Sequence, residues 1–339
     1  METTRKAGPE ASSTWSIERR QDLWESVMFQ RSLYKRLVTR TTNVASRLGE
    51  SEALQALSTL PPVTGHVWTD PDCAWLGFKG LVNEDEEFAL RVRVRRAMKL
   101  LQTYSRQPEP PALGYSNGEP PAEWLEQAIS EQTRELWHDT GADPHLTLGS
   151  AVAPEAEQRM QRAVHWMQTL WPEAAEQVGR LVRVIVWVSA PKYWSATAPY
   201  AYGAVFINPT ERWTVPYFLD TLLHETGHLS LMIKQSIHLF LENPLETATS
   251  PLRDDPRTLN GILHAAFSLK RICHGLTLYV NSDQPVDNRG DAAALLGGYS
   301  EKLRAATETL RKQGRFTPPG LELLQSLTGD SYHGAGKSC

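Results

Sequence analysis

The chain has 339 residues, 41% of them hydrophobic, and a formal net charge of −4. This length can bury one large core or two smaller ones, and the slightly acidic balance offers no electrostatic footprint for nucleic acid. No apolar stretch approaches the length of a membrane helix, the first residues carry no secretory signal, and the three cysteines suit a reducing compartment. We therefore expect a soluble, cytoplasmic protein that binds neither nucleic acid nor membrane.

The first half of the chain is predicted to be helical. Apolar residues recur with a period near 3.6 over 16–60, with a break near 49–51. Segments 123–138 and 154–178 carry the same pattern. Before the first of these two segments, 107–121 is rich in proline and glycine, and this composition is typical of a linker.

Two short strands are predicted next. Residues 181–188 are rich in β-branched and aromatic side chains, which favours a buried strand. A second strand is predicted over 202–207, and Asn208-Pro209 after it forms a turn signal.

A long apolar helix is predicted from Val215 to Lys234. Thr214 is a candidate N-cap, and Pro216 falls in the first turn, where its missing N–H costs nothing. Gly227 in the middle of the helix costs about 1 kcal/mol relative to alanine. We therefore expect another backbone, or a ligand, to approach the helix closely at that glycine.

This helix carries the sequence His-Glu-Thr-Gly-His, an H-E-x-x-H box. Residues four apart share a helix face, so His224 and His228 can direct two imidazole nitrogens at one metal ion. Glu225 lies beside them, where it can hold a metal-bound water or act as a base. The box therefore predicts a metal site, while two partly buried structural histidines remain the alternative.

A second apolar helix is predicted from Leu259 to Val280, with Thr258 as its cap. His264 falls in its second turn and is a candidate third ligand. The alternative for a single histidine on an apolar face is a hydrogen-bonded core residue.

The stretch from Gly203 to about Gly275 resembles the H-E-x-x-H proteins of bacterial natural-product clusters that are described as iron(II)/2-oxoglutarate-dependent peptide β-hydroxylases. The motifs that carry the resemblance are Asn208-Pro209, His224 to Leu229, and Ser250 to His264. The chain departs from the family pattern in the last of these, and the positions concerned are Leu252, Thr258 and Ala265. These departures flank the expected metal residues and leave open a peptide, a carrier-bound amino acid or a free amino acid as substrate.

The resemblance implies an enzyme that hydroxylates an sp³ carbon, expected at Cβ of an amino-acid residue, with dioxygen and 2-oxoglutarate as co-substrates. It implies iron(II) bound by His224, His228 and His264, with Glu225 as a fourth ligand or as an orienter of a ring or a water. The far carboxylate of 2-oxoglutarate needs a cation, for which arginine is suited. Arg257 is the first candidate because it precedes a helix N-terminus, and Arg253 is the second. Both arginines could instead pair with neighbouring aspartates and pin the loop.

Two other functions use the same box. In a gluzincin-like zinc metallopeptidase the third ligand is a glutamate, here Glu242 or Glu246, and Glu225 is the general base. Pro244 interrupts the helix on which that glutamate should sit, and this disfavours the peptidase. A non-enzymatic metal-binding module is the remaining alternative.

The predicted fold class is mainly α with a small β-sheet, built around a zincin-like H-E-x-x-H helix core. The expected division is a helical N-terminal region (1–110), a linker and helix (111–150), a metal-binding catalytic domain (151–313), and a C-terminal helix and tail (314–339).

Overall fold

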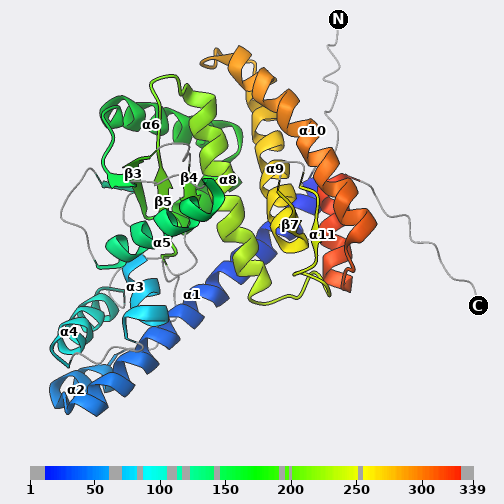
Figure 1. Cartoon of the computed structure of the whole chain (residues 1–339). Coiled ribbons are helices and arrows are strands. Elements are labelled where there is room, and N and C mark those ends of the chain that lie inside the picture. Colours follow the sequence, from blue (N-terminus) through cyan, green and yellow to red (C-terminus); the bar gives the residue numbers. More distant parts are fainter. Residues whose placement is uncertain are drawn as a thin grey trace, which may run out of the picture.

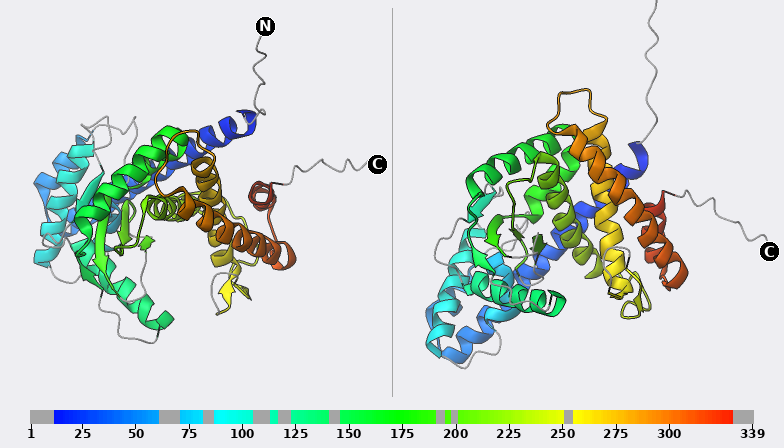
Figure 2. Two further views of the ribbon diagram at one scale, coloured as in Figure 1. Left: turned by 90° about the horizontal axis from the view of Figure 1, so that it is seen from above. Right: turned by 45° about the horizontal axis from the view of Figure 1, so that its top comes forward.

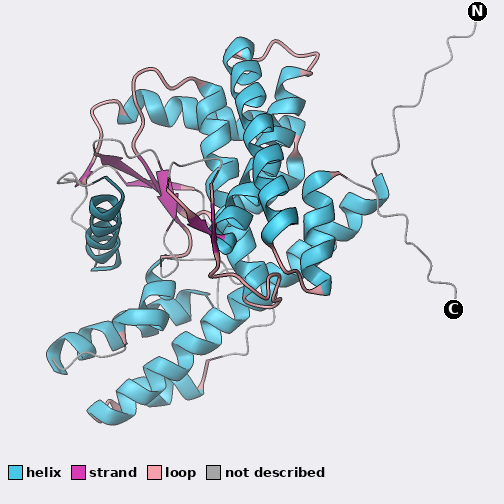
Figure 3. Cartoon of the chain, turned by 45° about the vertical axis from the view of Figure 1, so that its right-hand side comes forward, coloured by secondary structure: helices cyan, strands magenta, loops and turns pink. Residues whose placement is uncertain are grey.

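The computed structural model describes residues 12–60, 71–81, 87–104, 113–116, 123–140, 146–190, 195–197, 201–250 and 255–329. Within these ranges the chain is mainly helical, and its strands form one small sheet and a two-stranded ribbon (Figures 1 and 3). The coarse prediction, mainly α with a small sheet, is confirmed.

The first part of the chain is helical, as predicted. Its elements are α1 (Ser12–Leu48), α2 (Ser51–Ser58), α3 (Pro71–Trp75), the π-helical η1 (Leu76–Gly80), α4 (Glu87–Tyr104) and α5 (Glu123–Thr140). Gly49 separates α1 from α2 with a φ of 68°, a conformation that glycine adopts without strain. The predicted break near 49–51 is therefore confirmed.

The sheet contains the two predicted strands and three short ones that the sequence did not predict. β3 (Val184–Ser189) pairs in parallel with β1 (Gly114–Ser116) on one side and β5 (Ala204–Ile207) on the other. β4 (Ser195–Thr197) lies antiparallel to β5 at the edge, and β2 (Thr147–Leu148) pairs with the end of β3. β1 falls inside the segment predicted as a linker, because three residues are too few to show an alternating pattern.

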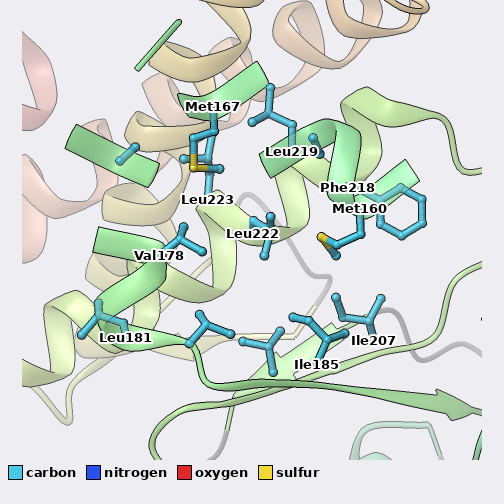
Figure 4. Close-up of a cluster of buried hydrophobic side chains, with 14 of the residues drawn as sticks. Met160, Met167, Val178, Leu181, Ile185, Ile207, Phe218, Leu219, Leu222 and Leu223 are labelled. Carbon is cyan, nitrogen blue, oxygen red and sulfur yellow. The ribbon is translucent and has the colours of Figure 1, made fainter. Parts of the chain in front are cut away.

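The sheet separates two apolar cores, and successive residues of β3 point into opposite ones. Ile185 and Trp187 pack with α6 (Ala153–Leu170), α7 (Pro172–Leu181) and α8 (Val215–Gln235). Figure 4 shows this first core, in which leucines of α8 face the sheet across side chains of α6 and α7. Val186 and Val188 pack on the other face against helices of the first part of the chain. The position of α8 is therefore fixed by its packing in the core on one face of the sheet.

On the side of α8 away from the sheet, three further helices, α9, α10 and α11, lie beside one another, as Figure 2 shows. α8 packs on α9 (Leu259–Val280), and α9 packs on α10 (Arg289–Gln313). A third apolar core joins the end of α8 and the start of α9 to α10 and α11 (Pro318–Thr328). The ribbon of β6 (Thr247–Ala248) and β7 (Arg257–Thr258) leads into α9.

The predicted bounds of α8 and α9 are confirmed, but only one of the two predicted caps is. Thr258 accepts a hydrogen bond from the backbone N–H of Gly261 at 3.1 Å and caps α9. The Thr214 side chain makes no capping bond to α8, and its hydroxyl donates to Asp291 on α10 at 2.7 Å. Thr214 therefore makes a tertiary contact in place of the predicted local one. Among the described helices, none is both long and apolar enough to cross a membrane.

Candidate metal centre

The candidate site lies at the interface of α8 and α9, where the two helices approach closely. A Cβ added to Gly227 would lie 2.7 Å from Ser268 Oγ and 3.1 Å from Ser268 Cα. The Ser268 hydroxyl also donates to the backbone carbonyl of His224 at 3.1 Å. The close approach predicted from Gly227 is therefore confirmed, and Ser268 on α9 is the neighbour that requires it.

This interface brings the three predicted histidines together. His224 Nε2 lies 3.0 Å from His228 Nε2, and His228 Nδ1 lies 3.2 Å from His264 Nδ1. Two nitrogens that bind one metal ion at about 2.1 Å each lie about 3.0–3.4 Å apart. The Nε2 atoms of His224 and His228 therefore have a spacing that fits a shared metal ion.

The third ring is adjacent but turned differently. His264 faces the Nδ1 atom of His228, whereas His224 faces the Nε2 atom of the same ring, so the donor nitrogens lie in a row. As the side chains stand, no three His, Cys, Asp or Glu side chains in the described ranges are arranged to hold one metal ion. A three-histidine site therefore requires the side chain of His264 or of His228 to turn.

The three histidines are held in their neutral form. Desolvation lowers the pKa of His224 and of His264 to about 4. Desolvation and the neighbouring rings lower the pKa of His228 well below its usual value. Neutral imidazoles carry the lone pairs that metal coordination needs, so the donor set suits zinc or iron.

Glu225 is fixed against the edge strand β4 rather than left in solvent. The carboxylate is 1% exposed, and the hydroxyl of Ser195 donates to its Oε1 atom at 2.6 Å. The other oxygen, Oε2, is buried and has no hydrogen-bond partner among the described residues. Burial raises the pKa of Glu225 to about 7, against the opposing effect of the Ser195 and Thr197 hydroxyls. A buried carboxylate with one unpartnered oxygen fits a role beside a metal ion or its bound water.

A second buried carboxylate, which the sequence analysis missed, lies one helical turn before His224. Asp220 accepts a hydrogen bond from the Tyr299 hydroxyl of α10 at 2.5 Å, and burial raises its pKa to about 7. Its charge also contributes to the raised pKa of Glu225. Its spacing of four residues from His224 was the available signal, since it places both residues on one helix face.

Two amides beside His264 were also missed. Gln235, the last residue of α8, has its Oε1 atom 2.9 Å from His264 Nε2. The amide nitrogen of Gln235 donates to Asn260 Oδ1 at 2.5 Å. No local pattern marks Gln235, because its partner lies 29 residues away on another helix.

Of the two predicted arginines, the structure describes one. Arg257 lies in β7, directly before the cap residue of α9. His264 follows six residues after Thr258, a rise of about 9 Å along the helix. Arg253 lies outside the described residues.

Neither glutamate of the peptidase alternative forms a metal-ligand group with the histidines in the described structure. Glu242 and Glu246 are both exposed, and Glu246 pairs with Arg315 at 2.7 Å and accepts from Asn243 at 2.8 Å. Pro244 prevents a helix there, as predicted, and the segment forms a turn instead. This disfavours the gluzincin-like ligand set.

Comparison of the chain with the models of known protein families and with curated proteins finds no match.

Proposed function

We propose that this protein is an iron(II)/2-oxoglutarate-dependent oxygenase that hydroxylates an sp³ carbon of an amino-acid residue, with Cβ as the expected position. The substrate is a peptide, a carrier-bound amino acid or a free amino acid. The observation that carries the proposal is the meeting of His224, His228 and His264 at the interface of α8 and α9. On the same proposal, the sheet, α8 and α9 form a zincin-like core in which β4 is the edge strand beside the box.

Each residue of the site has a proposed task. His224, His228 and His264 hold the metal as neutral rings, and the His228 side chain turns so that all three nitrogens share one point. Three protein ligands leave coordination positions open, and iron(II) bound there supplies the dioxygen chemistry of this enzyme class. Glu225, fixed by Ser195, directs its Oε2 atom toward the metal or a bound water. These roles are supported by the burial and neutrality of the groups.

The co-substrate is proposed to bind through Arg257. Its guanidinium can donate two parallel hydrogen bonds to the far carboxylate of 2-oxoglutarate, and the N-terminus of α9 adds a favourable field for an anion. Arg257 directly precedes the cap of α9 and His264 lies in the second turn of that helix, so the same helix start carries the proposed carboxylate-binding residue and a proposed metal ligand. Arg253 is kept as a second candidate for the same task.

The test is 2-oxoglutarate turnover by the iron-loaded protein, which needs no knowledge of the final substrate. In air we expect slow succinate formation that depends on iron, and without oxygen a weak visible charge-transfer band on addition of 2-oxoglutarate. Arg257→Met should weaken 2-oxoglutarate binding by about 10- to 100-fold, the loss of a charge-assisted pair. Arg304→Met, at an exposed position of α10, is the matched control and should leave binding unchanged.

The other outcomes assign the site to the alternatives. Peptide cleavage by the zinc form without oxygen would overturn the proposal in favour of a metallopeptidase. Metal binding with neither succinate formation nor cleavage would indicate a non-enzymatic metal-binding module.

A further inference from the structure

We infer that Gln235 is a positioning residue that fixes His264 in one tautomer, with the proton on Nε2 and the lone pair on Nδ1. The inference rests on the proposed metal site, and its starting point is the contact of 2.9 Å between Gln235 Oε1 and His264 Nε2. It assigns His264 a metal-binding atom, Nδ1, that differs from the Nε2 atoms of His224 and His228.

The orientation of the Gln235 amide is set by its second contact. Its nitrogen donates to Asn260 Oδ1 at 2.5 Å, and its oxygen faces His264 Nε2 at 2.9 Å. A carbonyl oxygen only accepts, and therefore His264 Nε2 must carry the hydrogen of that bond. Asn260 lies in the first turn of α9, and its backbone N–H donates to the carbonyl of Pro244 at 3.0 Å. The end of α8 and the first turn of α9 thus fix the amide together.

The tautomer of His264 determines that of the next ring. A neutral His264 with its proton on Nε2 has a bare Nδ1, which accepts from His228 Nδ1–H across 3.2 Å. His228 then carries its lone pair on Nε2, the atom that faces His224 at 3.0 Å. One amide therefore prepares lone pairs on two of the three rings.

The geometry explains why a polar residue ends α8 at this position. Histidine ligands bind metals best when the other ring nitrogen is held by an acceptor, and removal of such an acceptor weakens metal affinity by about 10- to 100-fold. Gln235 is the acceptor available to His264 in the described structure. It does not touch the metal in this account and acts only through the ring.

The first test reads the tautomer directly in the wild-type, metal-free full chain. Nitrogen-15 NMR of histidine-labelled protein should show His264 with Nδ1 bare and Nε2 protonated. On addition of Zn²⁺ the Nδ1 resonance should shift while the Nε2 proton remains. A proton on Nδ1 in the metal-free chain, or a metal shift at Nε2, would overturn the inference.

The second test uses variants and Zn²⁺ affinity. Gln235→Leu should weaken Zn²⁺ binding by about 10- to 100-fold and lose the single tautomer, whereas Gln235→Glu, which retains an acceptor oxygen, should restore both. Gln177→Leu is the matched control, since Gln177 also bonds to α8 but does so at Ser230 (3.2 Å). Unchanged affinity and tautomer in Gln235→Leu would contradict the inference. Zn²⁺ supports no oxidation, so a failed 2-oxoglutarate assay would leave this result standing.

Discussion

Buried ionisable side chains with opposing pH dependences surround the candidate site. In the metal-free folded protein the three histidines stay neutral, whereas in the unfolded chain they become protonated below about pH 6.5. Their effect is that stability falls as the pH drops from about 6.5 toward 4. Asp220 and Glu225 act the other way, because their raised pKa values make stability fall as the pH rises from about 4 to 7. Bound metal should extend the histidine effect to lower pH, because it keeps those rings deprotonated in the folded state while the unfolded chain still protonates them.

Asp220→Asn isolates one of these carboxylates. Asparagine keeps an acceptor for the Tyr299 hydroxyl but cannot ionise, so the variant avoids the cost of a buried charge. We expect little difference from the wild type near pH 4, and a stability gain that grows to at most about 4 kcal/mol above pH 7.

Urea unfolding of the metal-free proteins at pH 4.5 and 8 measures this difference. Glu308→Gln serves as the control, because Glu308 is in an exposed pair with Lys312 and should change stability little at either pH. A variant that is less stable than the wild type at pH 8 would show that Asp220 stabilises the fold as a charged group.

At the scale of helices and strands, the sequence predicts elements whose determinants are local. The bounds of α8 and α9 follow from apolar periodicity and from Pro216 and Thr258 at their starts. β4 was missed because three residues without apolar alternation carry no strand signal. As a result Ser195, which fixes Glu225, could not be identified before the sheet was known.

The packing of α8 on α9 depends on the missing side chain at Gly227. Gly227→Ala gains about 1 kcal/mol of helix propensity, but its Cβ meets Ser268 at 2.7 Å, and overpacking of this kind costs about 1–3 kcal/mol. We expect a net loss of stability and weaker metal binding, because the helices that carry the histidines move apart.

Gly297→Ala in α10 is the matched control. An added Cβ there has no neighbour within 4 Å, so this variant should be as stable as the wild type or up to about 1 kcal/mol more stable. Chemical denaturation and Zn²⁺ titration of both variants test the comparison. A Gly227→Ala protein as stable as Gly297→Ala would show that the close approach has no energetic consequence.

At the scale of the whole molecule, α1 connects the parts of the fold that the sequence suggested as separate segments. Phe29 and Leu33 pack in the core beneath α8, whereas Leu37 packs in the core on the other face of the sheet. Glu25 is buried and pairs with Lys234 at 2.7 Å, near the end of the helix that carries the box. The N-terminal helix is therefore part of the support of α8.

The sequence predicts local features of the fold but not contacts between residues that are far apart in the chain. His224 and His228 are about one helical turn apart, and His264 lies in a recognisable motif further along the chain. The sequence could therefore predict one site for all three histidines. Glu25 and Lys234 are 209 residues apart, and Gln235 and His264 are 29 apart. Pairs of this kind leave no periodic pattern, because only the packing of whole helices brings them into contact.

The central claim is that His224, His228 and His264 hold one metal ion, and metal titration of the full chain tests it most directly. We expect one Zn²⁺ or Fe²⁺ per chain, with affinity at least about 100-fold weaker in His264→Ala and unchanged in His165→Ala, an exposed histidine of α6. X-ray absorption of the loaded wild type should then show imidazole nitrogen ligands, and any further ligand should be a carboxylate or water oxygen. A chain that binds no metal, or a His264→Ala variant that binds it as tightly as the wild type, would contradict the account.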